Sequence, residues 1–217
     1  RVVGVGGTAW PRIVGRDTPA ETLYEAAHDR GKVVTGHGAG VGGDRLQAFA
    51  TTVDDDHEAI AGEGIRDRVA AGIHAVGRSG TIRDDIGAVA DAYPDLDAAE
   101  LSLSTDGMWP RELVEEGHMD EVLRRAVAAG IDPVDAVVMA TLTPARHFGR
   151  DDLGTLRPGT PADLTLFADL ESFDVVTTLV DGDVVYDGGD PGTPASPSFS
   201  YPDRFTGLVD LDVAEAD

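Results

Sequence analysis

Short apolar runs alternate with amphipathic stretches along the first half of the chain. Apolar and β-branched runs, each closed by glycine or a polar residue, predict five strands, at residues 2–5, 32–36, 51–53, 73–76 and 101–103. Between them, apolar positions recur at helical spacing and predict helices at residues 18–30, 44–50, 58–71 and 82–93. Strands that alternate with helices favour parallel pairing through helical crossovers, so the fold class is α/β.

The pattern changes after residue 106. Two amphipathic helices are expected, each ended by a glycine, at residues 119–129 and 133–148. Short strands follow, with Asp181-Gly182 as a hairpin turn between the last two, at residues 154–156, 162–167, 175–180 and 184–186. We therefore expect three parts: an α/β part (1–150), a small β unit (151–190), and a linker with an acidic tail (191–217).

The composition narrows the function classes. Of 217 residues, 41% are hydrophobic and 26% charged, which is typical of a globular protein, and no apolar run is long enough to span a bilayer. We expect a cytoplasmic protein that acts on no membrane. Cysteine is absent, which excludes disulfides, thiol nucleophiles and the paired-cysteine zinc site of nucleic-acid deaminases.

The net charge is strongly negative. The chain carries 40 acidic and 17 basic residues, a formal charge of −23, and the acidic residues are spread along its whole length. Such a surface is typical of salt-adapted, halophilic proteins, because counter-ions screen its self-repulsion. Nucleic acid is not expected as a partner, since phosphate binding requires a basic face.

A histidine or an aspartate follows three of the predicted strands. His37 stands between two glycines after the second strand, His57 follows the third, and Asp106 follows the fifth. In a β/α barrel such positions meet at one face. Two imidazoles and a carboxylate bind a divalent metal, and Asp106 would also move protons to and from a water. A loop histidine, a helix start and an aspartate turn are the respective alternatives.

Two further residues are candidates for contact with a substrate or with the metal-binding side chains. Glu58 is adjacent to His57, where a carboxylate often orients a metal-bound imidazole. Arg78 ends the fourth strand and would hold a substrate or a carboxylate, although a surface arginine is equally consistent with its position. The other histidines are not expected to be ligands; they are His28, His74, His118 and His147.

Several segments occur in an order found in a known family. They are residues 36–40 (GHGAG), 56–58 (DHE), 105–106 (TD), 113–120 (LVEEGHMD), 139–145 (MATLTPA), 153–164 (LGTLRPGTPADL) and 180–185 (VDGDVV). In these segments the chain resembles the adenine deaminase family of the amidohydrolase superfamily. The resemblance implies the C-terminal portion of a TIM-like (β/α)8 barrel, about strands 4–8, followed by part of a small β-sandwich.

The resemblance also implies a reaction. The expected chemistry is metal-dependent hydrolysis of a carbon–nitrogen bond outside peptides, the deamination of adenine to hypoxanthine and ammonia. The implied metal is Mn, Fe or Zn, with His37, His57 and Asp106 as ligands and Asp106 as the catalytic proton carrier. A small heterocycle is the expected partner, and the full-length protein is expected to form a homo-oligomer. The paired histidines of the family's first strand are not in this segment, so we expect it to be inactive alone.

The chain departs from the family pattern at two places. Residues 5–10 offer neither a glutamate nor a lysine to bridge two metals, and Gly107 stands where many adenine deaminases have a second aspartate. Two alternatives therefore stay open. One is another amidohydrolase, acting on a cyclic amide or a different aminated ring. The other is a non-catalytic barrel homologue that serves in binding or assembly.

Overall fold

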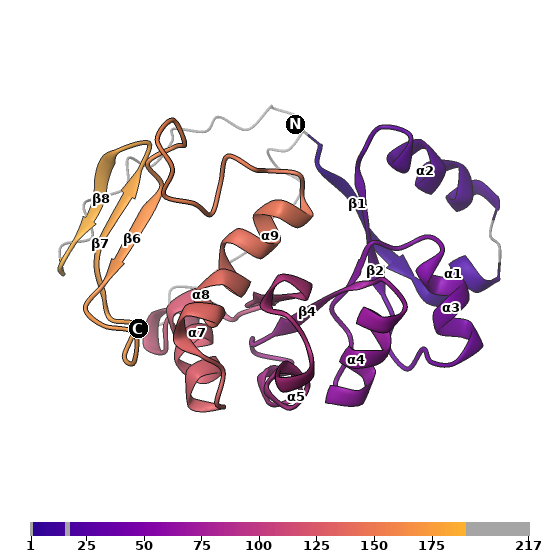
Figure 1. Ribbon diagram of the computed structural model, residues 1–217, viewed down its shortest axis with the longest axis horizontal. Coiled ribbons are helices and arrows are strands. Elements are labelled where there is room, and N and C mark those ends of the chain that lie inside the picture. Colours follow the sequence, from indigo (N-terminus) through magenta and orange to yellow (C-terminus); the bar gives the residue numbers. More distant parts are fainter. Residues whose placement is uncertain (1, 16–17, 190–217) are drawn as a thin grey trace, which may run out of the picture.

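The computed structural model describes residues 2–15 and 18–189, and its main element is a parallel sheet (Figure 1). The strands pair in chain order: β1 (Gly4–Ala9), β2 (Val33–His37), β3 (Asp55–Asp56), β4 (His74–Arg78) and β5 (Leu101–Ser104). A doubly wound sheet would reverse its strand order at a switch point, whereas this order is that of a β/α barrel. The predicted α/β class is confirmed.

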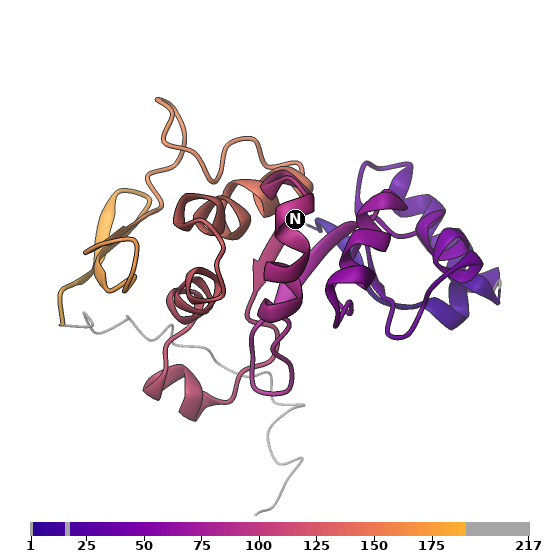
Figure 2. The ribbon, with the colours of Figure 1, turned by 60° about the horizontal axis from the view of Figure 1, so that its bottom comes forward.

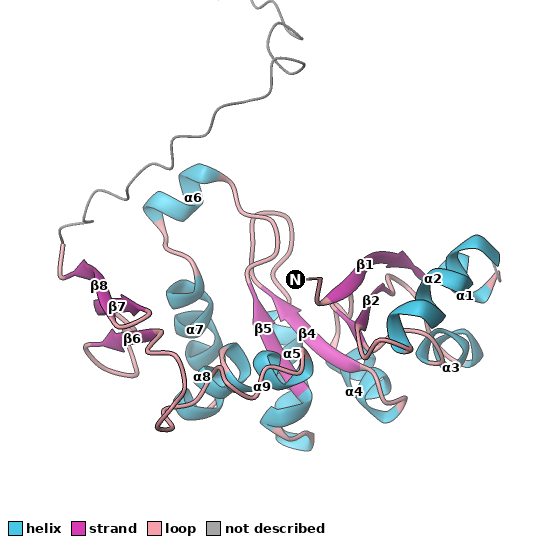
Figure 3. Ribbon diagram, turned by 90° about the horizontal axis from the view of Figure 1, so that it is seen from above, coloured by secondary structure: helices cyan, strands magenta, loops and turns pink. Residues whose placement is uncertain are grey.

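Helices connect the parallel strands. They are α1 (Trp10–Val14), α2 (Thr18–His28), α3 (Asp44–Ala50), α4 (Gly62–Ala70) and α5 (Ile86–Ala92). Seen from above, α3, α4 and α5 lie along the same side of the strands (Figure 3), as the outer helices of a barrel do. Apolar side chains fill the space between the layers, among them Val34, Phe49 and Ile73 around β2 and Val89 and Leu101 around β5.

A second group of elements follows the sheet. The 3₁₀ helices η1 (Tyr93–Asp95) and η2 (Ala98–Glu100) precede β5, and the helices after it are α6 (Pro110–Glu115), α7 (Met119–Ala128), α8 (Pro133–Ala140) and α9 (Leu142–His147). An antiparallel sheet then forms from β6 (Leu164–Phe167), β7 (Val175–Val180) and β8 (Asp183–Asp187). Figures 1 and 2 both place it at the end of the molecule away from α1–α3. None of the described helices is long and apolar enough to cross a membrane.

One aromatic side chain joins the antiparallel sheet to the helices. Phe173 is fully buried and belongs to the same apolar cluster as Val122 and Leu123 of α7. Its ring packs edge to face on Phe167 of β6, with centroids 5.3 Å apart. Beside it, the guanidinium of Arg124 donates a hydrogen bond to the carbonyl of Ser172 at 3.1 Å. The antiparallel sheet therefore shares a core with the α/β part.

The structure corrects two element boundaries beside the predicted site. The strand expected at 51–53 lies instead at Asp55–Asp56, because the amides of Thr52 and Val53 bond back to the carbonyl of Phe49 and close α3. The helix expected from residue 58 begins at Gly62, so His57 and Glu58 lie in a loop. Both corrections place candidate ligands at a strand end.

Other expected elements differ after residue 106. The single helix expected at 133–148 is two helices, since Thr141 leaves helical geometry (φ −132°) and Pro144, which has no N–H, falls in the first turn of α9. Helices α1 and α6 were not expected, and residues 154–156 form a bend and irregular backbone rather than a strand. Among residues 151–189, which the structure describes, one sheet forms where part of a β-sandwich was expected, so the sandwich stays a prediction. The linker and tail expected at 191–217 lie outside the described residues.

Candidate metal centre and pocket

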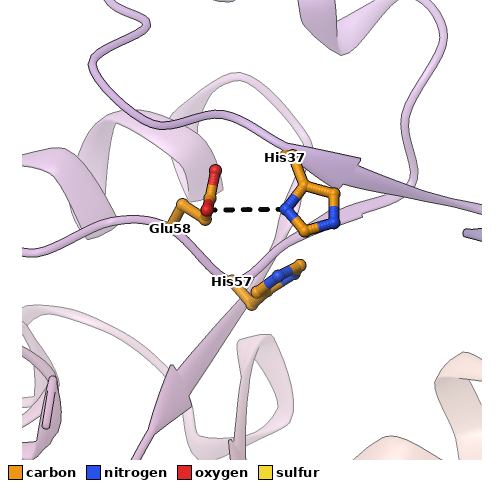
Figure 4. A group of neighbouring side chains, drawn as sticks. All are labelled: His37, His57 and Glu58. Atoms are coloured by element: carbon orange, nitrogen blue, oxygen red, sulfur yellow. Dashed lines mark ion pairs between the residues drawn. The ribbon is translucent and has the colours of Figure 1, made fainter. Parts of the chain in front are cut away.

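Two histidines lie side by side at the ends of neighbouring strands. The register of β2 and β3 pairs Gly36 with Asp56, which brings the residues that follow them, His37 and His57, to the same edge of the sheet. Their rings meet edge to face, with centroids 4.5 Å apart and planes at 75° (Figure 4). Two imidazoles from separate strands are thus held at one point by parallel pairing.

Glu58 completes a group of three. Its Oε1 lies 3.4 Å from Nδ1 of His37 (Figure 4). Its Oε2 accepts a hydrogen bond of 2.9 Å from the amide of Ala39. One nitrogen from each of His37 and His57 and one carboxylate oxygen lie within 4.8 Å of one another. Two imidazoles and a carboxylate at this spacing are a donor set that suits a divalent transition metal.

The electrostatics of this group favour metal binding. Burial lowers the pKa of His57, and the neighbouring His37 and Arg78 lower it further. Burial raises the pKa of Glu58, but hydrogen bonds from the Ala39 amide and from His37 outweigh this and leave the pKa below its usual value. A neutral imidazole and an ionised carboxylate are the forms that ligate metals.

Arg78 joins two carboxylates from different loops. Its Nε donates to Oδ2 of Asp85 at 2.8 Å, and its Nη1 donates to Oδ2 of Asp106 at 3.0 Å. Arg78 and Asp85 are buried, whereas the side chain of Asp106 is 44% exposed. Asp106 also has a positive φ of 54°, a conformation that costs energy in most residues and that often marks functional sites.

A pocket of about 340 Å³ lies against the inner side of the strands. His57, Arg78 and Asp106 border it, so one member of the histidine group faces the same cavity as the arginine–aspartate pair. Asp106 is not among the three clustered donors, and Glu58, expected only to touch the site, takes the third place in the group. The role of Asp106 as a metal ligand therefore stays a prediction.

Two histidines that were not expected to be ligands line the same pocket. His147 of α9 bonds through Nε2 to Oδ2 of Asp55 at 2.6 Å, and His74 of β4 bonds through Nε2 to Oγ of Ser102 at 2.7 Å. Their rings stack with centroids 4.5 Å apart. Burial, followed by the neighbouring His147, lowers the pKa of His74 to about 4. Their separation in sequence, 73 positions, gave no local signal of this contact.

Solved structures share the fold. The β-aspartyl dipeptidase of Fervidobacterium islandicum AW-1 superposes with a TM-score of 0.65 at 19% identity, over 87% of this chain and 58% of that one. The N-acetylglucosamine-6-phosphate deacetylase of Pasteurella multocida gives a TM-score of 0.61 at 18% identity, over 81% of this chain and 55% of that one. At these identities the likeness concerns the TIM-barrel-like fold alone.

The sequence comparisons agree with one family. The adenine deaminase of Deinococcus radiodurans is 38% identical over 184 residues, which are 84% of this chain and 34% of that protein. The adenine deaminase of Halalkalibacterium halodurans is 32% identical over 213 residues, 97% of this chain and 36% of that protein. The chain thus spans about a third of the length of these relatives, and the resemblance to adenine deaminases is confirmed. Residues 1–185 match the model of the amidohydrolase family, to which this chain therefore belongs.

Proposed function

We propose that the full-length protein containing this chain is a metal-dependent deaminase that converts adenine to hypoxanthine and ammonia. The group of His37, His57 and Glu58 is the observation that supports a metal-dependent hydrolase. The similarity to adenine deaminases over most of the chain supports adenine as the substrate. The 217-residue chain alone would lack activity, because a barrel needs strands beyond the five parallel ones seen here.

His37 and His57 are the residues that would hold the metal, with Glu58 against the ring of His37. Mn, Fe and Zn all accept imidazole and carboxylate donors. When bound, the metal would polarise the substrate and lower the pKa of the attacking water toward neutrality. Burial of His57 keeps its imidazole neutral and ready for this role.

Asp106 would carry the protons. Water adds to the ring carbon that bears the amino group, and the carboxylate of Asp106 accepts a water proton. It then donates that proton to the amine nitrogen as the carbon–nitrogen bond breaks and ammonia leaves. Arg78 fixes one carboxylate oxygen at 3.0 Å, and the exposed part of the side chain borders the pocket. Arg78, itself held by Asp85, orients the acid rather than carrying a proton.

The test measures ammonia release from adenine by the full-length gene product that contains this chain. Activity should disappear after chelation and return when Mn²⁺, Fe²⁺ or Zn²⁺ is added back. A matched panel of cyclic amides and other aminated rings is assayed under the same conditions. Turnover of a panel compound without turnover of adenine would reject adenine as the substrate. A metal-free preparation that remains fully active would reject the metal centre itself.

A further inference from the structure

A buried ion pair includes the residue that directly precedes His57. Asp56 of β3 and Arg68 of α4 contact each other through Oδ2 and Nε, and their side chains are 0% and 4% exposed. Removing two charges from water is costly, and a buried ion pair is often no more stabilising than apolar residues of similar volume. The contacts that this pair makes with the rest of the chain therefore indicate its use.

Both members of the pair bond to the backbone of one residue, Gly38. The amide of Gly38 donates to Oδ1 of Asp56 at 2.9 Å, and Nη2 of Arg68 donates to the carbonyl of Gly38 at 2.7 Å. Arg68 also reaches the carbonyl of Gly64 in its own helix through Nη1 at 3.0 Å. The pair thus holds the Gly38 backbone at both its amide and its carbonyl, and we call these two hydrogen bonds the grip on Gly38. The bond from Arg68 to Gly64 ties the guanidinium to α4.

The grip requires a residue without a side chain. A Cβ placed on Gly38 would lie 2.4 Å from Oδ2 of Asp56, closer than any real contact. Gly42, five residues from His37 in the same loop, has open space around the corresponding position. Glycine at 38 is therefore needed for the approach of the carboxylate, whereas glycine at 42 is not.

We propose that Asp56 and Arg68 are positioning residues that set the directions of the two metal-binding histidines. Gly38 directly follows His37, and Asp56 directly precedes His57. One buried pair therefore fixes the backbone next to both imidazoles. The hydrogen bond from the Ala39 amide to Glu58 joins the same two loops one residue further along. This inference rests on the proposed metal site.

The experiment compares metal binding by the full-length protein and three variants: Gly38→Ala, Arg68→Lys and the control Gly42→Ala. Arg68→Lys keeps a positive charge opposite Asp56, but a single ammonium group cannot reach both Asp56 and the carbonyl of Gly38 as the guanidinium fork does. The probe is Co²⁺, whose visible absorption reports coordination geometry, with Zn²⁺ competition for affinity. Loss of an outer hydrogen-bond partner lowers metal affinity on the order of 10- to 100-fold.

We expect Gly38→Ala and Arg68→Lys to bind Co²⁺ at least about 10-fold more weakly, with an altered spectrum, and Gly42→Ala to match the wild type. The proposal would be overturned if Gly38→Ala and Arg68→Lys kept the Co²⁺ affinity and spectrum of the wild type. It would also be overturned if Gly42→Ala lost as much affinity as they do.

Folding and the metal site are separated by two further measurements. Ile65→Ala, a core change on α4 that leaves the pair intact, lowers stability and should leave the Co²⁺ spectrum unchanged; a spectrum changed as in Gly38→Ala would overturn the proposal. If the wild type binds no metal, the proposed function fails, and amide hydrogen exchange of Gly38 then tests the grip. The proposal is supported if the Gly38 amide is protected in the wild type and loses protection in Arg68→Lys. It is rejected if this amide exchanges in the wild type as fast as in an unfolded chain.

Discussion

His74 makes the stability of this protein depend on acid in a calculable way. Its ring stacks on His147, bonds to Ser102, and has a pKa lowered to about 4 by burial and then by His147. An unfolded histidine has a pKa of about 6.5. Between these values the unfolded chain binds a proton that the folded chain refuses, so stability is complete above about pH 6.5 and is lost as the pH falls toward 4.

The expected loss follows from the two pKa values. Relative to neutral pH, His74 alone should lower the free energy of unfolding by about 2 kcal/mol at pH 5 and about 3 kcal/mol at pH 4. The assay is denaturant unfolding followed by circular dichroism at pH 7.5 and pH 5. His74→Gln is the matched control, because its amide reaches Ser102 in place of Nε2 and does not titrate.

Subtracting the control removes the acid response of the carboxylates that both proteins share. The difference in unfolding free energy between wild type and His74→Gln should change by about 2 kcal/mol between the two pH values. Curves that run parallel from pH 7.5 to pH 5 would show that the folded His74 titrates normally and would refute the reasoning.

Three further predictions concern the site, the core and the surface. Asp106→Asn should keep bound metal and the left-handed turn, which asparagine adopts readily, yet lose turnover by roughly 10²–10⁴-fold. Metal content and ammonia release measured together check this, and near-normal turnover would remove Asp106 from the reaction. Phe173→Ala should lower the unfolding free energy by about 3–5 kcal/mol, since the side chain is fully buried; a loss below about 1 kcal/mol in denaturant unfolding would contradict its place in the shared core. The melting temperature should rise from low to molar salt as the charge of −23 is screened, and a flat salt series would refute the halophilic interpretation.

The sequence predicted the sheet well because its signal is local. Alternating apolar runs and amphipathic stretches found the region of four of the five parallel strands, and the family resemblance supplied their barrel-like arrangement. The third strand was misplaced because Asp55 and Asp56 are polar and read as a loop. Their carboxylates are buried only because His147, Arg68 and the Gly38 amide satisfy them, and no window of neighbouring residues contains all of these partners.

The site was predictable to the extent that it depends on strand ends. His37 and His57 follow neighbouring strands and meet as expected, since parallel register determines their proximity. The partners of the site were less predictable. Nothing in the sequence of α4 distinguishes Arg68 from the other charged residues of that helix, and Asp85 follows a loop. Both are nevertheless buried against residues of the candidate site or next to it. Burial of a charge is a tertiary property, which helical or strand periodicity does not encode.

The many acidic residues of this chain divide into two populations that salt should affect differently. Those on the surface repel one another, and at 0.1 M salt counter-ions largely screen the repulsion between charges more than about 10 Å apart. Asp56 and Asp85 are instead buried against Arg68 and Arg78, where salt screens far less. Rising salt should therefore stabilise the fold through its surface while leaving unchanged the two ion pairs next to the candidate metal ligands and Asp106. The geometry of the candidate site should therefore be the same at low and at high salt, although the stability of the fold differs.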